Sequence, residues 1–159
     1  MSAQSSSRKH LLMVWHSQSG NTARLAEAVA EGAAEFAEEV ELRRVRALEA
    51  GLDELLWAEG LLIGTPENFG YLSGAVKDFL DRTYYPAQGR VDGLPWAMFV
   101  SCDNDGRGAV QALERIALGY NWKRVAEPLI ARGPVQPEHL AQARELGQTL
   151  AAGLAYGAY

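Results

Sequence analysis

Hydrophobic and polar residues follow one another along this chain in two different patterns. Short apolar runs such as Leu11–Trp15 end in polar turns, which is typical of strands buried on both faces. Longer segments repeat an apolar residue every three or four positions, as Leu25, Val29 and Ala33 do, and this spacing predicts helices with one buried face. The chain therefore reads as alternating strands and helices.

The two patterns together predict five strands and five helices. The predicted strands are residues 11–15, 40–45, 60–64, 95–100 and 125–131. The predicted helices start at Thr22, about Leu52, Gly74, about Val110 and Pro137. Pro128 places the last strand at a sheet edge, because proline cannot donate to a strand ladder. This alternation is typical of the α/β class, with a mostly parallel sheet covered by helices on both faces.

Length and composition fit one domain. The chain has 159 residues, of which 48% are hydrophobic, enough to bury a sizeable core. We expect residues 1–9, which are polar and Ser-rich, to form a flexible N-terminal tail, and residues 10–159 to form a single domain. The apolar run after Lys9 is too short for a secretory signal, and no window approaches the ~20 apolar residues of a membrane span.

The net charge and the cysteine content argue against several classes of function. A formal net charge of −5 argues against non-specific nucleic-acid binding, which needs clustered basic residues. Cys102 is the only cysteine, so neither an intramolecular disulfide nor a cysteine-based metal cluster is possible. We therefore expect a cytoplasmic protein with no metal site and no nucleic-acid or membrane partner.

Three loops stand at the place where an open α/β sheet binds its ligand, beyond the carboxyl ends of the strands. They comprise residues 17–22, 65–72 and 102–108, after the first, third and fourth predicted strands. All three are rich in small, polar and glycine residues, which allow a ligand to approach the backbone closely.

The first loop leads directly into the first predicted helix, and its composition predicts an anion site. It consists of Ser17, Gln18, Ser19, Gly20, Asn21 and Thr22. A helix N-terminus offers unpaired N–H groups and partial positive charge, and the hydroxyl groups of this loop can add donors for a phosphate. The alternative is that Ser19 or Asn21 simply caps the helix. The P-loop and dinucleotide-binding glycine motifs are both absent here.

Two segments of the chain resemble a known family. The loop SQSGNT after an apolar strand, followed by TPENFGYLSGAVKDFLDRT, is similar to the flavodoxin-like FMN proteins. The resemblance is strongest to the NAD(P)H-dependent FMN reductases and the quinone reductases of the tryptophan-repressor-binding-protein type. It implies a three-layer sandwich with a five-stranded parallel sheet in the order 2-1-3-4-5. It also implies bound FMN, NAD(P)H as co-substrate, a small-molecule electron acceptor, and a homodimer or homotetramer.

The resemblance also implies a set of cofactor-binding residues. The ribityl phosphate is expected on residues 17–22. The isoalloxazine ring is expected to meet Pro66, Glu67, Asn68, Phe69, Gly70 and Tyr71. The third loop is expected to close over the ring with Ser101, Cys102, Asp103, Asn104 and Gly106. Because flavin carries the difficult chemistry itself, no dedicated catalytic residue is predicted. Ordinary loop packing is the alternative for Phe69 and Tyr71.

The third loop departs from the pattern of these reductases, which usually carry small Gly and Thr residues there. This chain has two carboxylates, Asp103 and Asp105, followed by Arg107. Our hypothesis is that the two carboxylates disfavour an anionic reduced flavin and so lower its reduction potential. The alternative is that they face solvent and that Arg107 offsets their charge.

Three functions remain open from the sequence. The first is an oxidoreductase that passes electrons from NAD(P)H through FMN to a quinone, a flavin or a similar small acceptor. The second is an electron-transfer flavodoxin that docks with protein partners, although such carriers tend to be more acidic than this chain. The third is a flavin-binding module without turnover.

Overall fold

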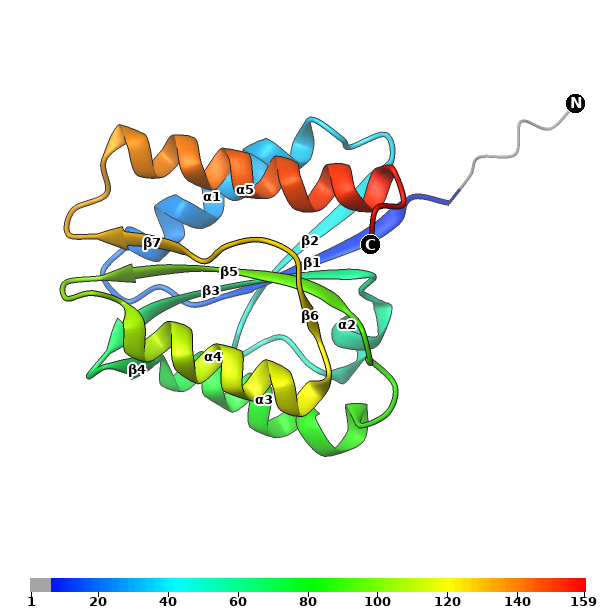
Figure 1. The fold of residues 1–159 in the computed structure, drawn as a ribbon, viewed down its shortest axis with the longest axis horizontal. Coiled ribbons are helices and arrows are strands. Elements are labelled where there is room, and N and C mark those ends of the chain that lie inside the picture. The colour runs from blue at the N-terminus through cyan, green and yellow to red at the C-terminus, as the bar shows by residue number, and fades with distance from the viewer. Residues whose placement is uncertain (1–6) are drawn as a thin grey trace, which may run out of the picture.

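A parallel sheet forms the middle of three layers in the computed structural model, which describes residues 7–159 (Figure 1). Its main strands are β1 (Lys9–Trp15), β2 (Val40–Arg46), β3 (Gly60–Asn68) and β5 (Pro95–Cys102). Two short strands, β6 (Lys123–Arg124) and β7 (Leu129–Arg132), pair in parallel with β5 at one edge. The order is β2-β1-β3-β5 followed by β6 and β7, which confirms the order 2-1-3-4-5.

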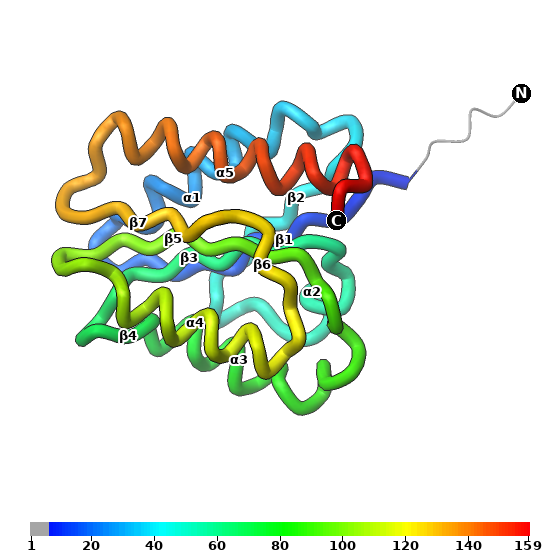
Figure 2. Tube along the Cα trace, viewed as in Figure 1, coloured from blue at the N-terminus to red at the C-terminus, as the bar shows by residue number. Residues whose placement is uncertain are grey.

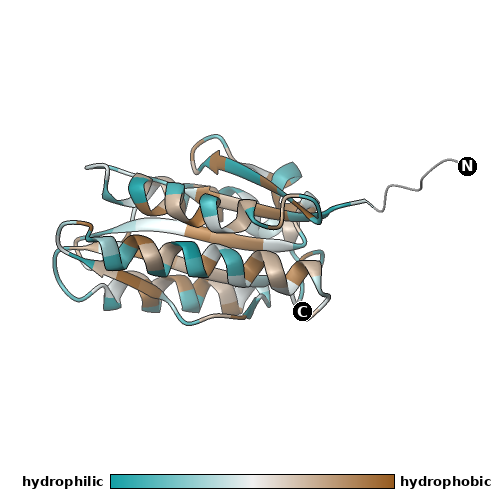
Figure 3. Cartoon of the chain, turned by 90° about the horizontal axis from the view of Figure 1, so that it is seen from above, coloured by the Kyte–Doolittle hydropathy of each residue, from teal (hydrophilic) through white to brown (hydrophobic). Residues whose placement is uncertain are grey.

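Helices cover both faces of this sheet, as the predicted fold class requires. Figure 1 shows α1 (Asn21–Ala34) and α5 (Pro137–Ala155) on one face. The other face carries α2 (Leu52–Trp57), α3 (Gly74–Ala87) and α4 (Arg107–Tyr120). The helices alternate between hydrophilic and hydrophobic residues along their length, consistent with one buried and one exposed side (Figure 3). No helix within residues 7–159 is long and apolar enough to cross a bilayer.

The apolar core is divided by the sheet into two clusters, and the strands contribute to both. In β1 the side chains of Leu12 and Val14 pack under α2, α3 and α4, whereas Leu11 and Met13 pack under α1 and α5. All four are fully buried. A strand with side chains in both clusters cannot show a polar face, which explains why its sequence is a continuous apolar run.

Several strand boundaries differ from the predictions, and tertiary pairing explains each difference. Strand β3 continues to Asn68 and turns back as β4 (Tyr71–Leu72), because it pairs with β5 and then with β4. Strand β5 continues to Cys102 because β7 pairs with its last residues. The predicted strand 125–131 starts too early: β6 ends at Arg124, before it, and only β7, which begins after Pro128 and ends at Arg132, lies in that range.

The N-terminal boundary also differs. Residues 1–6 of the predicted tail lie outside the described residues. Lys9 does not belong to a tail, because it begins β1 and pairs in register with Val40 of β2.

The N-terminal ends of the strands lie at one end of the molecule together with the C-terminus, and the β3–β4 hairpin and the turn after β5 lie at the opposite end (Figure 2). The loops that are predicted to bind a ligand are therefore all at one end.

Candidate functional site

A cleft of about 210 Å³ lies where the three predicted loops meet. Its lining comes from the loop after β1, the end of β3 and the end of β5, and it consists of Gln18, Ser19, Asn21, Pro66, Glu67, Asn68, Ser101, Cys102 and Asp103. All nine belong to the predicted cofactor-binding set. The other members of that set surround the cleft without lining it: Ser17, Gly20, Thr22, Phe69, Gly70, Tyr71, Asn104 and Gly106.

Side-chain hydrogen bonds hold the three loops together. The Asn68 side-chain amide donates to Gln18 Oε1 over 3.0 Å, joining the end of β3 to the first loop. The hydroxyl groups of Thr22 and Ser101 are buried and lie 2.7 Å apart, joining the first loop to β5. The Thr22 hydroxyl therefore has a structural role with Ser101, and its role as a phosphate donor stays a prediction.

The N-terminus of α1 is open to an anion. The preceding residue, Gly20, has a φ of 103°, which a residue with a side chain rarely adopts, and no side chain caps the helix. Within residues 7–159 the backbone amides of Asn21, Thr22 and Ala23 have no hydrogen-bond acceptor. The alternative that Ser19 or Asn21 caps this helix is therefore wrong, and the free amides suit a phosphate.

The Ser17 side chain holds the turn of the first loop in place. Its Oγ accepts a hydrogen bond of 3.1 Å from the Gly20 amide, which fixes the turn. A hydroxyl that accepts this bond keeps its own hydrogen for another acceptor. Ser17 can therefore still donate to an anion, as predicted, although it does not line the cleft.

The N-terminus of α4, by contrast, is occupied by side chains of the chain itself. Glu67 Oε2 accepts hydrogen bonds from the amides of Gly108 (3.1 Å) and Ala109 (3.3 Å). Asp105 Oδ1 accepts another from the Arg107 amide over 3.1 Å. The Glu67 carboxylate thus caps α4 and fixes the third loop against β3. Glu67 also lines the cleft, and its contact with a flavin ring stays a prediction.

The segment around Phe69 is a tight hairpin, which the sequence did not predict. Asn68 pairs with Tyr71, and the two residues between them have positive φ values, 53° for Phe69 and 73° for Gly70. Asn-Gly is the usual sequence of such turns, and phenylalanine is rare at positive φ, so the usual signal was missing. The Phe69 side chain is fully exposed at the tip, and Tyr71 is partly exposed.

Cys102 is a buried, free thiol. Its Sγ lies 3.4 Å from the Asn104 carbonyl oxygen and 3.8 Å from that of Ala131. Burial, together with the nearby Glu67 carboxylate, raises the pKa of this thiol above its usual value. A thiol with a raised pKa is a poor nucleophile at neutral pH. Within the described chain no cluster of His, Cys, Asp or Glu side chains could hold a metal ion.

The two aspartates of the third loop have different surroundings. Asp105 caps the Arg107 amide and lies 3.8 Å from the Arg107 guanidinium, so Arg107 offsets its charge. Asp103 is exposed and lines the cleft. The hypothesis that these carboxylates lower the reduction potential of a bound flavin therefore rests on Asp103 alone.

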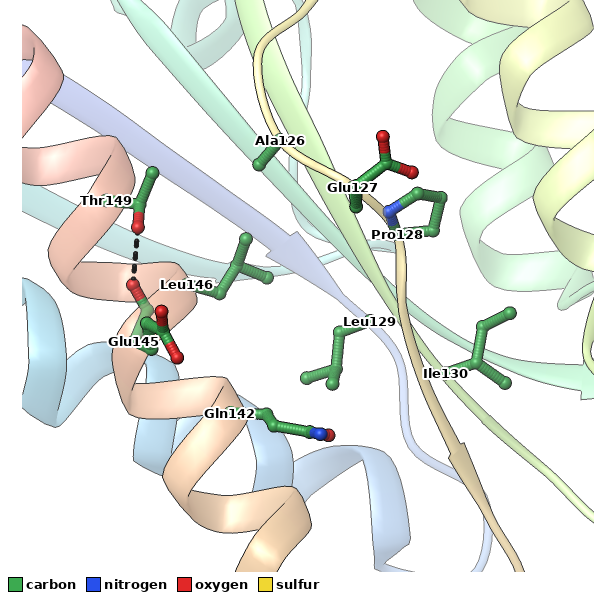
Figure 4. Close-up of a pocket in the computed structure, with 9 residues that line it drawn as sticks. All are labelled: Ala126, Glu127, Pro128, Leu129, Ile130, Gln142, Glu145, Leu146 and Thr149. Carbon is green, nitrogen blue, oxygen red and sulfur yellow. Dashed lines mark hydrogen bonds between the residues drawn. The ribbon is translucent and has the colours of Figure 1, made fainter.

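A second hollow, of about 470 Å³, lies between α5 and the stretch 126–130 (Figure 4). Apolar side chains such as Leu129 and Leu146 form much of its wall, and Thr149 donates within its own helix to the Glu145 carbonyl over 2.8 Å. None of its residues belongs to the three ligand loops. Its size alone does not make it a candidate cofactor site, because none of the predicted cofactor-binding residues lines it.

Comparison with known proteins agrees with this geometry. Residues 11–131 match the family model described as NADPH-dependent FMN reductase. The chain belongs to this family. It is 31% identical over 172 residues to an NAD(P)H dehydrogenase (quinone) of Archaeoglobus fulgidus, with 93% of this chain and 83% of that protein covered. The family-model match over residues 11–131 includes all three strand ends that form the cleft.

Two further similar proteins bear on the fold and on how much of a relative this chain spans. A flavodoxin of Aquifex aeolicus is 37% identical over 98 residues, covering 62% of this chain but only 52% of that protein. The chain thus spans about half the length of this curated relative. The crystal structure of a flavodoxin, WrbA-like protein from Agrobacterium tumefaciens has a TM-score of 0.75 and 25% identity, with 94% of this chain and 98% of that chain covered. This FMN reductase family member therefore has the flavodoxin-like fold that the sequence predicted.

Proposed function

We propose that this chain is an oxidoreductase that takes electrons from NAD(P)H through bound FMN and passes them to a quinone or a similar small acceptor. The observation that carries the proposal is the open N-terminus of α1 beside a cleft made by three loops. The family and the quinone dehydrogenase relative support it.

The residues present fit a flavin monophosphate. The free amides of Asn21, Thr22 and Ala23 and the Ser17 hydroxyl would hold the phosphate through neutral donors, with partial positive charge from the helix. Pro66, Asn68 and the end of β5 would hold the ring in the cleft. When bound, FMN supplies the hydride chemistry itself. The protein binds and orients, so no acid–base residue of the chain is needed.

The deciding experiment mixes the FMN-loaded protein with NADPH or NADH under anaerobic conditions and follows the flavin absorbance. Rapid bleaching followed by reoxidation on adding a quinone supports the proposal. A protein that takes up no FMN, or whose flavin stays oxidised with both nucleotides, contradicts it. Ser19→Asp serves as the disrupted variant and should take up little FMN, because a carboxylate in the loop repels phosphate without removing any packed side chain.

An electron-carrying flavodoxin is the second candidate, favoured by the likeness to the Aquifex flavodoxin. This function requires reduction by a protein reductase and not by the nucleotide alone. The same anaerobic mixture distinguishes the two, because only a carrier stays oxidised until such a reductase is added.

The proposal also covers the oligomeric state and the cellular location of the protein. We propose a homodimer or homotetramer in the cytoplasm, where NAD(P)H is available and the single thiol stays reduced. Light scattering after size-exclusion chromatography measures the mass directly against a monomer of 17.3 kDa.

A further inference from the structure

A pocket of about 300 Å³ lies where the last turns of α4 meet β6 and the start of β5. Its lining consists of Trp96, Glu114, Ala117, Leu118, Trp122 and Arg124. Trp96 is the second residue of β5, whereas Ser101 and Cys102, which line the cleft, are its last two. The pocket and the cleft therefore lie at opposite ends of this strand, and the function proposed above does not use the pocket.

The walls of the pocket are mostly aromatic and apolar. The rings of Trp96 and Trp122 are tilted by 52° to one another, with their centroids 6.0 Å apart. Trp122 also stacks on Tyr120, with 4.2 Å between the ring centroids, and this contact holds its indole in place. Sites for small molecules commonly combine walls of this kind with a small number of well-placed polar groups.

The indole N–H of Trp122 is a polar group without an acceptor. Trp122 is 7% exposed, and its Nε1 atom is buried. Among the buried side-chain nitrogen and oxygen atoms that the structure describes, Trp122 Nε1 is the one without a hydrogen-bond partner. An indole nitrogen only donates, and the neighbouring Trp96 ring offers at most a weak π acceptor. An oxygen acceptor brought to this nitrogen would therefore be stabilising, because a buried donor without an acceptor is unfavourable.

The charged residues of the pocket are already paired. Arg124 forms one ion pair with Glu114, inside the pocket, and another with Glu127, whose carboxylate lies 3.7 Å from the Arg124 guanidinium. An anionic ligand would meet these two carboxylates, and a cationic ligand would meet the guanidinium. The pocket therefore favours a neutral ligand that brings an acceptor for the indole N–H.

We propose that this pocket binds a small neutral molecule with a flat apolar body and one carbonyl oxygen, such as a bicyclic aryl ketone. The flat body lies against the rings of Trp96 and Trp122, and the carbonyl oxygen accepts a hydrogen bond from Trp122 Nε1. Nε1 is closed to solvent, so entry of the ligand requires a small shift of the lining, for which the exposed side chain of Leu118 is free. The proposal does not rest on the proposed function, because it involves neither the flavin nor a nucleotide.

The test uses two probes of nearly the same shape, 1-tetralone and tetralin, which differ by the carbonyl oxygen. Each is titrated into the FMN-loaded, ¹⁵N-labelled protein, and the indole N–H signals of the four tryptophans are followed by NMR. NOE contacts with Tyr120 assign the Trp122 signal without any variant. We expect 1-tetralone to move this signal downfield, as a new hydrogen bond does, and tetralin not to. Both probes carry a benzene ring, so the difference between them reports the hydrogen bond and not ring currents.

The dissociation constants give the second readout. 1-Tetralone should bind the wild type about tenfold more tightly than tetralin, because it alone brings an acceptor to the buried donor. Trp122→Phe keeps an aromatic ring but loses the N–H, and it should bind both probes with equal affinity. Trp57→Phe changes a tryptophan outside the pocket and is the matched control, which should keep the tenfold difference.

Three results would overturn the proposal. The first is that neither probe binds the wild type, and the second is that both bind it equally. The third is a tenfold difference that persists in Trp122→Phe, since the carbonyl would then bind elsewhere. If Trp122→Phe does not fold, the wild type alone decides: a downfield shift of the Trp122 signal with 1-tetralone supports the proposal, and its absence contradicts it.

Discussion

The helices α1 and α4 begin at the same end of the sheet with similar backbone geometry and opposite surroundings. Each follows a glycine with positive φ, Gly20 before α1 and Gly106 before α4, and neither glycine can cap its helix with a side chain. At α4 the Glu67 carboxylate accepts from two first-turn amides, whereas at α1 the corresponding amides have no acceptor within residues 7–159.

The difference separates a helix start that the chain caps itself from one whose first-turn amides are open. An uncapped helix start leaves several donors without partners, and a cap typically contributes about 1 kcal/mol. The chain meets this need at α4 with its own carboxylate, whereas at α1 the first-turn amides stay free, and there we propose that the FMN phosphate binds. The two helix starts should therefore respond differently to mutation: changes at α4 should act mainly on stability, and changes at α1 mainly on FMN affinity.

Gly108→Ala should have the largest effect and act on stability. A Cβ at this position would lie 1.8 Å from the Gly70 carbonyl oxygen, so α4 would have to move away from the hairpin. Such overpacking against backbone should lower the free energy of unfolding by about 3 kcal/mol, measured by urea denaturation. Gly74→Ala is the control, because an added Cβ there meets nothing within 4 Å. Unchanged stability of Gly108→Ala would contradict the close contact between α4 and the hairpin.

Ser19→Asp should act on binding at α1. A carboxylate a few ångströms from the FMN phosphate costs about 2.7 kcal/mol at an intermediate effective dielectric, which corresponds to a Kd raised about 100-fold. Fluorescence titration of the cofactor-free protein with FMN measures it. The neutral variant Ser19→Asn should keep its affinity within a few fold, and apo stability should change little in both. If Ser19→Asp binds FMN as tightly as the wild type, the phosphate does not lie at α1.

Glu67→Gln should be intermediate and act on stability. The variant keeps the size of the side chain and loses the charge that favours the α4 N-terminus, so the free energy of unfolding should fall by about 1 kcal/mol. Glu38→Gln, at an exposed position in a turn, is the matched control. A loss of FMN affinity larger than that of Ser19→Asp, without a loss of stability, would show that Glu67 serves the ligand and not the helix.

Asp103→Asn should have the smallest effect, on the reduction potential of the bound flavin. Asp103 is exposed, so solvent screens its charge, and removing it should raise the potential by on the order of 10–20 mV. Asp92→Asn, in the exposed loop before β5, controls for net charge. Spectroelectrochemical titration measures the flavin potential of both variants. If Asp103→Asn has the same potential as Asp92→Asn, the Asp103 charge does not affect the flavin.

Much of the fold could be predicted from the sequence because its signals are local. The apolar run Leu11–Trp15 and the helical spacing of Leu25, Val29 and Ala33 each report burial of neighbouring residues. The hairpin at Phe69 was missed because phenylalanine is an unusual residue at positive φ, and only pairing of Asn68 with Tyr71 sets that turn. Strand β5 was predicted too short because its last residues are held by β7.

The sequence by itself determined the layers, the loops at the carboxyl ends of the strands and the small polar residues that those loops carry, since periodicity and composition are properties of neighbouring residues. Only the tertiary structure decided which helix start is capped and which is open. Glu67 and the Gly108 amide are 41 residues apart, and their hydrogen bond exists because β3 and β5 lie side by side in the sheet. A contact between residues so distant along the chain leaves no local pattern from which it could be predicted.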